Sequence, residues 1–510
     1  MRKYSFVRRF PSLATLARAC LCAALLAGVR GITAALAATP KPEPYLVEDI
    51  YPGIGGSEPY YLTAVGNTLF FVAIDETHGD ELWRSDGTEA GTVMVKDIFP
   101  GKFNSHPENL INVNGTLFFR ASDGIHGEEL WRSDGTEAGT VMVKDIIPGS
   151  GGSAGIYNPD WVVFDGKVFF IANDGVHGDE LWRSDGTEAG TELVKDIYTG
   201  VNGSQMIFIT PTTDVLYLGA RDETHGTELW RSDGTEAGTE LVKDINAGAS
   251  DSLFTYYIDH WLAIDNTLFF IASDGINGFE LWRSNGAEDN TVLVKDIYPG
   301  GMDSNPTNLT DVNGVILFSA YSPGHGNELW RSDGMAENTV MVKDIFPGGL
   351  SSVPGYNSEG WPVVNHTAFF IATDGISGYE LWRSDGTAEG TVLVKDINPG
   401  YYGSEPRWII NLGGRLFFTA ENVAYGEELW QSDGTEAGTE LVKDIYPGSA
   451  GSRPRFLTNV TGRLFFTASN YDYNYYYFLA SQQAEAVPEI PFGVELWSIR
   501  HLTYVPLVVK

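Results

Sequence analysis

One phrase recurs along this chain, and its spacing limits the possible folds more than any other feature. The tripeptide Glu-Leu-Trp occurs nine times, and successive tryptophans are 48, 51, 48, 52, 48, 52, 48 and 67 residues apart. Eight copies stand within a phrase close to "ELWRSDGT", and a strand-like phrase close to "LVKDI" follows each of them. A repeat of about 48 residues predicts one supersecondary unit per repeat, stacked in an array, rather than separate domains of ordinary size.

The unit from 106 to 149 shows what each repeat contains. It reads as short strands at 108–113, 116–121, 128–133 and 140–146, separated by the hairpin signal "NG", the polar loop "SDGIHG" and the turn "DGTEAG". Four short antiparallel strands per repeat are typical of a β-propeller blade. The sequence therefore predicts an all-β propeller of about nine four-stranded antiparallel blades. A linear β-solenoid or a set of separate small sheets is the competing arrangement.

A register for the outer hairpin follows from placing Ser133 opposite Thr140 across the turn. Glu129 then faces Lys144, and opposite charges across a strand pair stabilise it by roughly 0.2–1 kcal/mol. The other predicted pairs of this hairpin are Trp131 with Met142 and Leu130 with Val143. The same Glu and Lys recur in the other repeats as Glu81/Lys96, Glu180/Lys195, Glu228/Lys243, Glu280/Lys295, Glu328/Lys343, Glu380/Lys395 and Glu428/Lys443.

The two ends of the array complement each other. "LVEDIYPG" at 46–53 is a fourth strand with no blade before it, and the ninth repeat has "VELWS" but no "LVKDI". Residues 45–50 are therefore predicted to enter the last blade and close the ring, which removes exposed strand edges. The rival for this position is "PLVVK" at 506–510. In the favoured arrangement Glu48 would face Glu495, and this like-charge pair would make the closing hairpin the weakest one.

These motifs resemble those of a known family. The sequence is similar to the bacterial ELWxxDGT-repeat proteins over essentially the whole chain after its first segment, and the resemblance implies a secreted repeat protein with no settled activity. The copies "ELWRSNGAEDNT" (280–291), "ELWRSDGMAENT" (328–339) and "ELWQSDGT" (428–435) depart from the motif, and "ELWSIR" lacks "DGT". The turn also resembles the Asp-box of propeller sialidases, which implies a structural hairpin and no sialidase activity.

The first 37 residues have the order of a secretory signal. Five basic residues precede the apolar run "ACLCAALLAGV", and small residues end it, so we expect cleavage after Ala37 or Ala38, a short linker at 38–44 and a single propeller domain at 45–510. An uncleaved anchor is the alternative. Both cysteines lie in the signal, so the exported chain would have no disulfide. We expect a secreted or cell-surface protein, monomeric and with no membrane span.

The charge balance is acidic. The net charge is −34 and becomes −40 without residues 1–37, which argues against nucleic-acid partners and attraction to an anionic membrane. Repeated polar residues could form a metal site, but a residue present in most blades is better explained as part of the scaffold. We therefore interpret the turn residues such as Asp134 as Asx-turn acceptors. The loop histidines are interpreted as hydrogen-bonded loop residues: His78, His126, His177, His225 and His325. No metal or other cofactor is predicted, and the short loops do not support Ca²⁺ binding.

Features that break the repeat are better candidates for a site. The ninth repeat has an insertion at 470–493 between its second and third strands, with Tyr471, Tyr473, Tyr475, Tyr476 and Tyr477 crowded in it. Tyrosine presents an apolar face and a hydroxyl, which suits recognition of a glycan or a protein. The first strands of the last two repeats begin near Arg407, Arg453 and Arg455. Because the fourth-to-first and second-to-third connections of a propeller lie on one face, these residues are predicted to form one ligand-binding surface.

Two functions compete. The first is a non-enzymatic binding or scaffold module for a glycan or protein; a purely structural envelope component is a third possibility. The second is a secreted propeller-type polysaccharide hydrolase or lyase, which would need unrepeated acids or a base near the central channel. Its candidate residues are Asp160, Asp259, His260 and Glu359. They recur at one position of the longer repeats, so we favour the first function and assign no catalytic residue.

Overall fold

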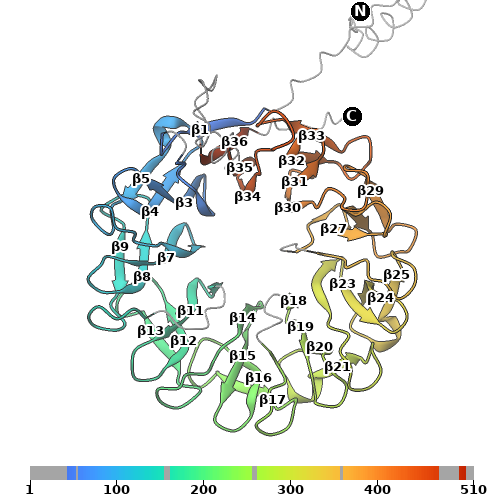
Figure 1. Cartoon of the computed structure of the whole chain (residues 1–510). Coiled ribbons are helices and arrows are strands. Elements are labelled where there is room, and N and C mark those ends of the chain that lie inside the picture. The colour runs from blue at the N-terminus through green and yellow to red at the C-terminus, as the bar shows by residue number, and fades with distance from the viewer. Residues whose placement is uncertain are drawn as a thin grey trace, which may run out of the picture. The chain divides into compact units, whose positions relative to one another are not determined.

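The computed structural model describes residues 43–52, 55–153, 161–254, 261–356, 360–469 and 493–500. In these ranges the chain forms nine four-stranded antiparallel sheets, here called blades 1 to 9, which are arranged as a ring (Figure 1). The first strand of each blade lies innermost and the fourth outermost. The nine-bladed propeller predicted from the repeat is confirmed.

The strands follow the repeat closely. Blades 1 to 3 contain β2 (Tyr60–Val65), β3 (Thr68–Asp75), β4 (Gly79–Ser85), β5 (Val93–Lys96), β6 (Glu108–Val113), β7 (Thr116–Ser122), β8 (Glu128–Ser133), β9 (Val141–Lys144), β10 (Val162–Phe164), β11 (Lys167–Asn173), β12 (Asp179–Ser184) and β13 (Glu192–Lys195). Blades 4 to 6 contain β14 (Phe208–Pro211), β15 (Leu216–Asp222), β16 (Gly226–Ser232), β17 (Glu240–Lys243), β18 (Leu262–Ile264), β19 (Thr267–Ala272), β20 (Glu280–Ser284), β21 (Val292–Lys295), β22 (Thr307–Val312), β23 (Val315–Ser322), β24 (Gly326–Ser332) and β25 (Val340–Lys343). Blades 7 to 9 contain β26 (Val363–Val364), β27 (Thr367–Thr373), β28 (Tyr379–Ser384), β29 (Val392–Lys395), β30 (Arg407–Leu412), β31 (Arg415–Asn422), β32 (Gly426–Ser432), β33 (Glu440–Lys443), β34 (Arg455–Val460), β35 (Arg463–Ser469), β36 (Val494–Arg500) and β1 (Tyr45–Glu48).

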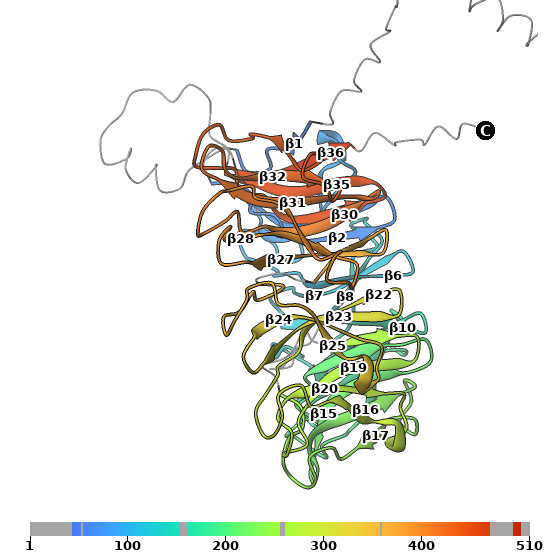
Figure 2. The same ribbon diagram turned by 90° about the vertical axis from the view of Figure 1, so that its right-hand side faces the viewer.

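Helical structure in the described ranges is confined to single turns. These are the 3₁₀ segments η1 (Glu89–Gly91), η3 (Glu288–Asn290) and η4 (Ala336–Asn338), all in hairpin turns between the third and fourth strands. None of the described helices has the length and apolar character needed to cross a bilayer. Figure 2 shows the ring from the side, with the strands of successive blades beside one another.

The core lies between blades, and this explains the continuous apolar runs of the second strands. In β7, Leu117, Phe118 and Phe119 are all no more than 3% exposed. Leu117 and Phe119 pack against blade 1, whereas Phe118 packs against blade 3. A strand with a neighbour on each face needs apolar side chains at successive positions rather than at alternate ones. Nine such apolar clusters occupy the nine boundaries of the ring.

The predicted register of the outer hairpin is correct at one point and wrong at two. Trp131 pairs with Met142, as predicted, and the hydroxyls of Ser133 and Thr140 are 2.7 Å apart. A bulge then shifts the ladder, so Leu130 pairs with Lys144 and not with Val143. The predicted pairing of Glu129 with Lys144 is therefore wrong, because Val143 is an extra residue on the fourth strand and leaves the lysine opposite Leu130, one position short of the glutamate.

Each partner of the predicted pair has another role. Lys144 Nζ donates a hydrogen bond to the carbonyl of Thr191 in the next blade, at 2.6 Å. The Glu129 side chain is buried and accepts hydrogen bonds from the backbone N–H groups of Ile146 and Ile147. The lysines thus join neighbouring blades, and the glutamates fix the chain that leaves each blade.

The ring is closed by the N-terminal strand. β1 pairs with β36 in the order β1–β36–β35–β34, which confirms the closure predicted from the repeat. The rival stretch 506–510 lies outside the described residues. The expected like-charge pair does not form, because Glu48 pairs with Leu496 and Glu495 accepts hydrogen bonds from the backbone N–H groups of Ile50 and Ser57.

Candidate functional site

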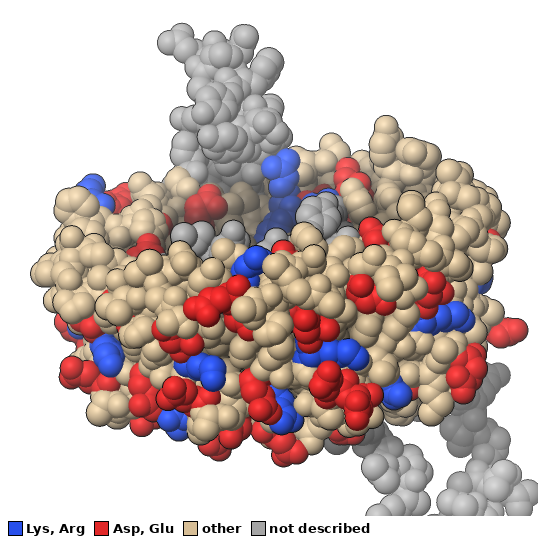
Figure 3. Space-filling view, turned by 90° about the horizontal axis from the view of Figure 1, so that it is seen from below, with Lys and Arg blue, Asp and Glu red and all other residues tan. Residues whose placement is uncertain are grey.

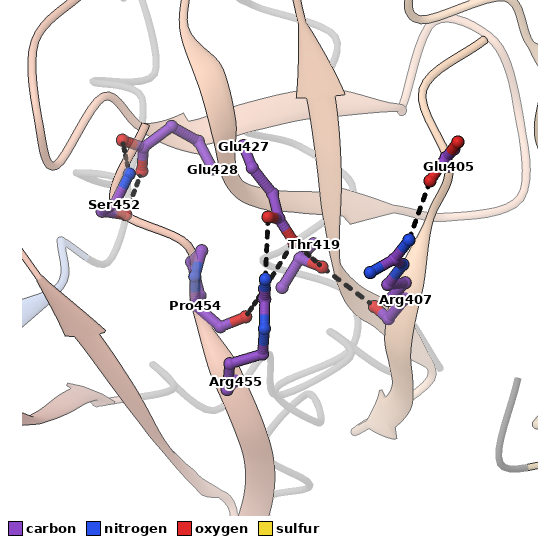
Figure 4. Close-up of polar contacts among 8 residues, drawn as sticks. All are labelled: Glu405, Arg407, Thr419, Glu427, Glu428, Ser452, Pro454 and Arg455. Atoms are coloured by element: carbon purple, nitrogen blue, oxygen red, sulfur yellow. Dashed lines mark hydrogen bonds and ion pairs between the residues drawn. The ribbon is translucent and has the colours of Figure 1, made fainter. Parts of the chain in front are cut away.

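The repeated glutamate is hydrogen-bonded to a serine that comes before each innermost strand. We call this glutamate–serine pair the support. In blade 8, Oε1 of Glu428 accepts hydrogen bonds from the N–H groups of Tyr446 (3.0 Å) and Ser452 (2.8 Å), and Oε2 accepts one from the Ser452 hydroxyl (2.6 Å; Figure 4). Burial raises the pKa of Glu428 to about 7, although the serine and backbone donors act in the opposite direction. The support recurs around the ring as Glu495/Ser57, Glu81/Ser105, Glu228/Ser252, Glu280/Ser304, Glu328/Ser352 and Glu380/Ser404.

In seven blades the residue after this serine has a strained backbone, and its side chain differs from blade to blade; in blade 5 the equivalent residue, Leu253, does not have this conformation. In blade 8 Glu405 has φ 43°, and in blade 9 Arg453 has φ 51°, values in the left-handed region that non-glycine residues rarely adopt. The same conformation occurs at Glu58 (45°), His106 (47°), Gln205 (45°), Asn305 (45°) and Val353 (47°). We call these seven residues the collar. The hydrogen bonds between the glutamate and the serine hold the backbone in place here. The collar side chain can therefore vary from blade to blade while the backbone conformation stays the same.

Ionisable collar residues gather in four consecutive blades. Glu405, Arg453, Glu58 and His106 stand at the first strands of blades 8, 9, 1 and 2, whereas the described collar positions of blades 4, 6 and 7 are uncharged. The outer rim, by contrast, carries acidic side chains interspersed with basic ones (Figure 3). The arc over blades 8, 9, 1 and 2 is therefore the part of the collar where ionisable side chains stand in place of the uncharged ones in the other described blades.

The three predicted arginines lie in this arc, and the structure brings two of them together. Arg455 contacts both carboxylate oxygens of Glu427 from the neighbouring blade, with Nη2 at 2.9 Å from Oε2 (Figure 4). The backbone N–H of Arg453 donates to the carbonyl of Glu427 at 2.9 Å. Arg407 instead pairs with Glu405 at 2.8 Å. The Arg453 side chain is exposed, and its guanidinium has no hydrogen bond or ion pair with any residue that the structure describes.

The tyrosines predicted for the site, Tyr471, Tyr473, Tyr475, Tyr476 and Tyr477, lie outside the described residues. The ends of the described chain on either side of the insertion are nevertheless placed. The N–H of Ser469 donates to the carbonyl of Ser452, at 3.0 Å, and the N–H of Glu58 donates to the carbonyl of Val494, at 3.0 Å. Both ends of the insertion thus lie next to collar positions of the arc.

Arg120 is a residue of this arc that the sequence reasoning missed. It stands in the second strand of blade 2, where the other blades have Val, Ile, Gly, Ser or Thr, and it contacts Glu108 and Glu128. Its side chain is only 14% exposed. A cavity of about 700 Å³ lies beside this cluster and is lined by Phe103, His106 and Glu128 among others. The sequence feature that could have identified Arg120 is the single charged residue within the apolar phrase "LFFRA".

The repeated polar residues have structural roles where they are described. Oδ1 of Asp134 accepts hydrogen bonds from the N–H and the hydroxyl of Thr136 at 2.9 and 2.7 Å, which is the Asx-type turn that we expected. Nδ1 of His126 is 2.7 Å from Oδ2 of Asp123, and this hydrogen bond raises the pKa of the histidine. His78, His177 and His225 repeat the arrangement, whereas His325 contacts Asp344.

The remaining candidates are less informative. The hydrolase or lyase candidates Asp160, Asp259, His260 and Glu359 lie outside the described residues. Within the described ranges, no group of three or more His, Cys, Asp or Glu side chains is placed to hold a metal ion.

Comparison with known proteins gives matches among solved structures. No protein-family model and no curated protein sequence matches this chain. Among solved structures, a puromycin hydrolase matches with 13% identity over 81% of this chain and 59% of its own, at a TM-score of 0.38. Oligopeptidase B from Leishmania major matches with 10% identity over 82% and 53% of the two chains, at a TM-score of 0.38. A prolyl endopeptidase matches with 13% identity over 71% and 54%, at a TM-score of 0.37. The matched part is less than two thirds of each of these proteins.

Proposed function

We propose that this chain is a secreted or cell-surface ELWxxDGT-repeat protein that acts as a non-enzymatic binding or scaffold module for a glycan or protein ligand. It acts as a monomer and needs no cofactor. The observation that carries the proposal is the collar, in which one Glu–Ser support recurs around the ring while the side chain that follows it changes. A rigid repeated support with variable side chains is suited to presenting a local binding surface.

The proposed ligand surface is the arc over blades 8, 9, 1 and 2. Arg453 offers an exposed guanidinium to an acidic or hydroxyl group of the ligand. Arg455 is held by Glu427, so it is positioned before the ligand arrives and loses little side-chain entropy on binding. Arg407 and the tyrosines of the insertion complete the proposed surface.

The test is a binding screen of the purified chain against immobilised polysaccharides and extracellular proteins, scored for both retention and release of soluble products. We expect retention without product, and we expect Arg453→Ala and deletion of 471–490 each to weaken it at least tenfold without changing Tm. Arg231→Ala is the matched control, since it removes an Arg–Glu pair from the outer hairpin of blade 4. Unchanged retention in both arc variants would contradict the proposed surface, and product release would support the hydrolase or lyase alternative instead.

A further inference from the structure

Among the residues that the structure describes, the innermost strands of five blades contain a bulge, and three of these bulges hold an aromatic residue in a strained conformation. In β34, Arg455 pairs with Thr467 and Thr458 pairs with Phe465, so the first strand has one residue more than its partner between these pairs. The residue after the first pair is left-handed: Tyr61 (φ 52°), Asn109 (54°), Asn308 (57°), Trp408 (54°) and Phe456 (54°). Asparagine tolerates this conformation, whereas Tyr, Trp and Phe rarely adopt it.

The three aromatic residues lie in consecutive blades, and we call them the aromatic row: Trp408 in blade 8, Phe456 in blade 9 and Tyr61 in blade 1. The ring centroids of Trp408 and Phe456 are 5.0 Å apart, and the planes are tilted by 56°. The hydroxyl of Thr458 lies 3.4 Å from the carbonyl of Leu62, so the strands that carry Phe456 and Tyr61 are neighbours. The row therefore follows the inner wall of the ring.

The row remains accessible. Tyr61 is 45% exposed, and Trp408 and Phe456 are half-buried. A cavity of about 410 Å³ opens beside the row and is lined by Trp361, Pro362 and Trp408 among others. This volume lies in the range of small-ligand sites, about 300–1,000 Å³. An aromatic residue that stays in a strained backbone conformation and yet keeps its ring accessible is better explained by a ligand than by packing.

The chemistry of the row favours sugar rings over an extended peptide. Aromatic faces stack against the apolar C–H faces of pyranose rings, and the adjacent Arg407–Glu405 and Arg455–Glu427 pairs offer donors and acceptors to sugar hydroxyls. A peptide would bind at such an edge by adding a β-strand. The bulges interrupt the edge hydrogen-bonding pattern of these innermost strands, which works against strand addition.

We propose that the aromatic row of Trp408, Phe456 and Tyr61 is a stacking surface for a polysaccharide segment that lies across blades 8, 9 and 1. This inference rests on the proposed binding function and names its ligand class. The bulge itself also occurs with Asn109 and Asn308, so what sets blades 8, 9 and 1 apart is that the strained position carries an aromatic ring. A glycine at the same position would keep the backbone and remove the ring, which separates a functional role from a structural one.

The experiment uses the full chain with three probes, cellohexaose, chitohexaose and hexagalacturonate, followed by calorimetry and by tryptophan fluorescence. At least one probe should bind and change the fluorescence. Trp408→Gly and Phe456→Gly should each weaken that binding at least tenfold while Tm stays the same or rises. Tyr401→Gly and Tyr402→Gly are the matched controls, since these tyrosines are 80% and 77% exposed and lie outside the row, and they should leave the affinity unchanged.

Each other outcome has a definite meaning. If no hexasaccharide binds, or if the Gly variants bind as well as the unsubstituted chain, the inference is wrong. If an extended decapeptide binds at the row and the hexasaccharides do not, the ligand class is wrong. Retention of another ligand that depends on Arg453 but not on Trp408 would leave the proposed function standing and overturn the inference alone.

Discussion

The closing strand offers the sharpest test of how the ring is held together. Val47 and Ile50 are 5% and 8% exposed and pack with Leu69, Phe71 and Leu496 in the cluster between blades 9 and 1. Burying an aliphatic side chain of this size contributes about 1.5–3 kcal/mol. Deleting residues 45–50 removes both side chains, so about 3–6 kcal/mol of apolar burial is lost. It also removes the ladder to β36 and the hydrogen bond from the Tyr45 hydroxyl to the carbonyl of Gly87, at 2.9 Å.

This loss is large compared with the free energy of unfolding of a typical domain, about 5–15 kcal/mol. We expect Tm to fall by about 3–6 °C, because an unfolding entropy of about 2.1 cal/mol/K per residue gives a domain of this length a shift of about 1 °C per kcal/mol. Differential scanning calorimetry of the deletion variant measures the change, and deletion of 506–510 is the matched control because it removes the rival strand. The exposed edge of β36 should also make the deletion variant associate, which light scattering would detect. A shift below about 2 °C for the 45–50 deletion, together with a large one for 506–510, would refute closure by β1.

Three further predictions concern the supports and the joints between blades. Ser452→Ala should lower the free energy of unfolding by about 1.5–3 kcal/mol in denaturant titration, because the buried carboxylate of Glu428 loses a hydroxyl donor; an unchanged midpoint would show that the support is not needed. The free energy of unfolding should fall as pH rises from about 4.5 to 7 and then level off. Burial raises the folded-state pKa of Glu428 and its equivalents to about 7, so the folded protein holds more protons than the unfolded chain in this window. Glu428→Gln should make the pH dependence of stability shallower, and a free energy of unfolding that rises across the window would contradict the prediction. Lys144→Met should lower the free energy of unfolding by about 1 kcal/mol, because it removes the hydrogen bond from the ammonium group to the carbonyl of Thr191 in the next blade. The same free energy of unfolding as in a Lys102→Met variant, in which an exposed lysine is replaced, would count against a role for Lys144 in joining the two blades.

The sequence was sufficient for the architecture because the repeat encodes local structure. The hairpin signals, the turn and the apolar second strand of blade 2 lie where their residues predicted, and the unpaired phrase at 46–53 identified the closing strand. The failure at Glu129 and Lys144 has a physical cause. A bulge adds one residue to the ladder without any distinctive residue type, so counting back from the turn gives the wrong partner.

The support of the collar could have been predicted from the same repeat. Eight of the nine repeated glutamates are followed 24 residues later by a serine, as in Glu81 and Ser105 or Glu428 and Ser452. The strained collar and the aromatic row could not have been found in this way, because they depend on backbone conformations that a varied set of side chains adopts. The arginines were placed in the correct part of the ring, but their pairing with Glu405 and Glu427 follows from contacts between strands that the repeat does not specify.

The position of one serine has a consequence for the order in which the molecule assembles. Every other support joins a glutamate to a serine 24 residues further along, so it can form soon after that short segment leaves the ribosome. Ser57 bonds to Glu495 instead, across 438 residues of sequence. The beginning of the first blade therefore lacks its glutamate support until the last strand has been synthesised, and a chain that stalls before that point exposes the edges of both its first and its last blade.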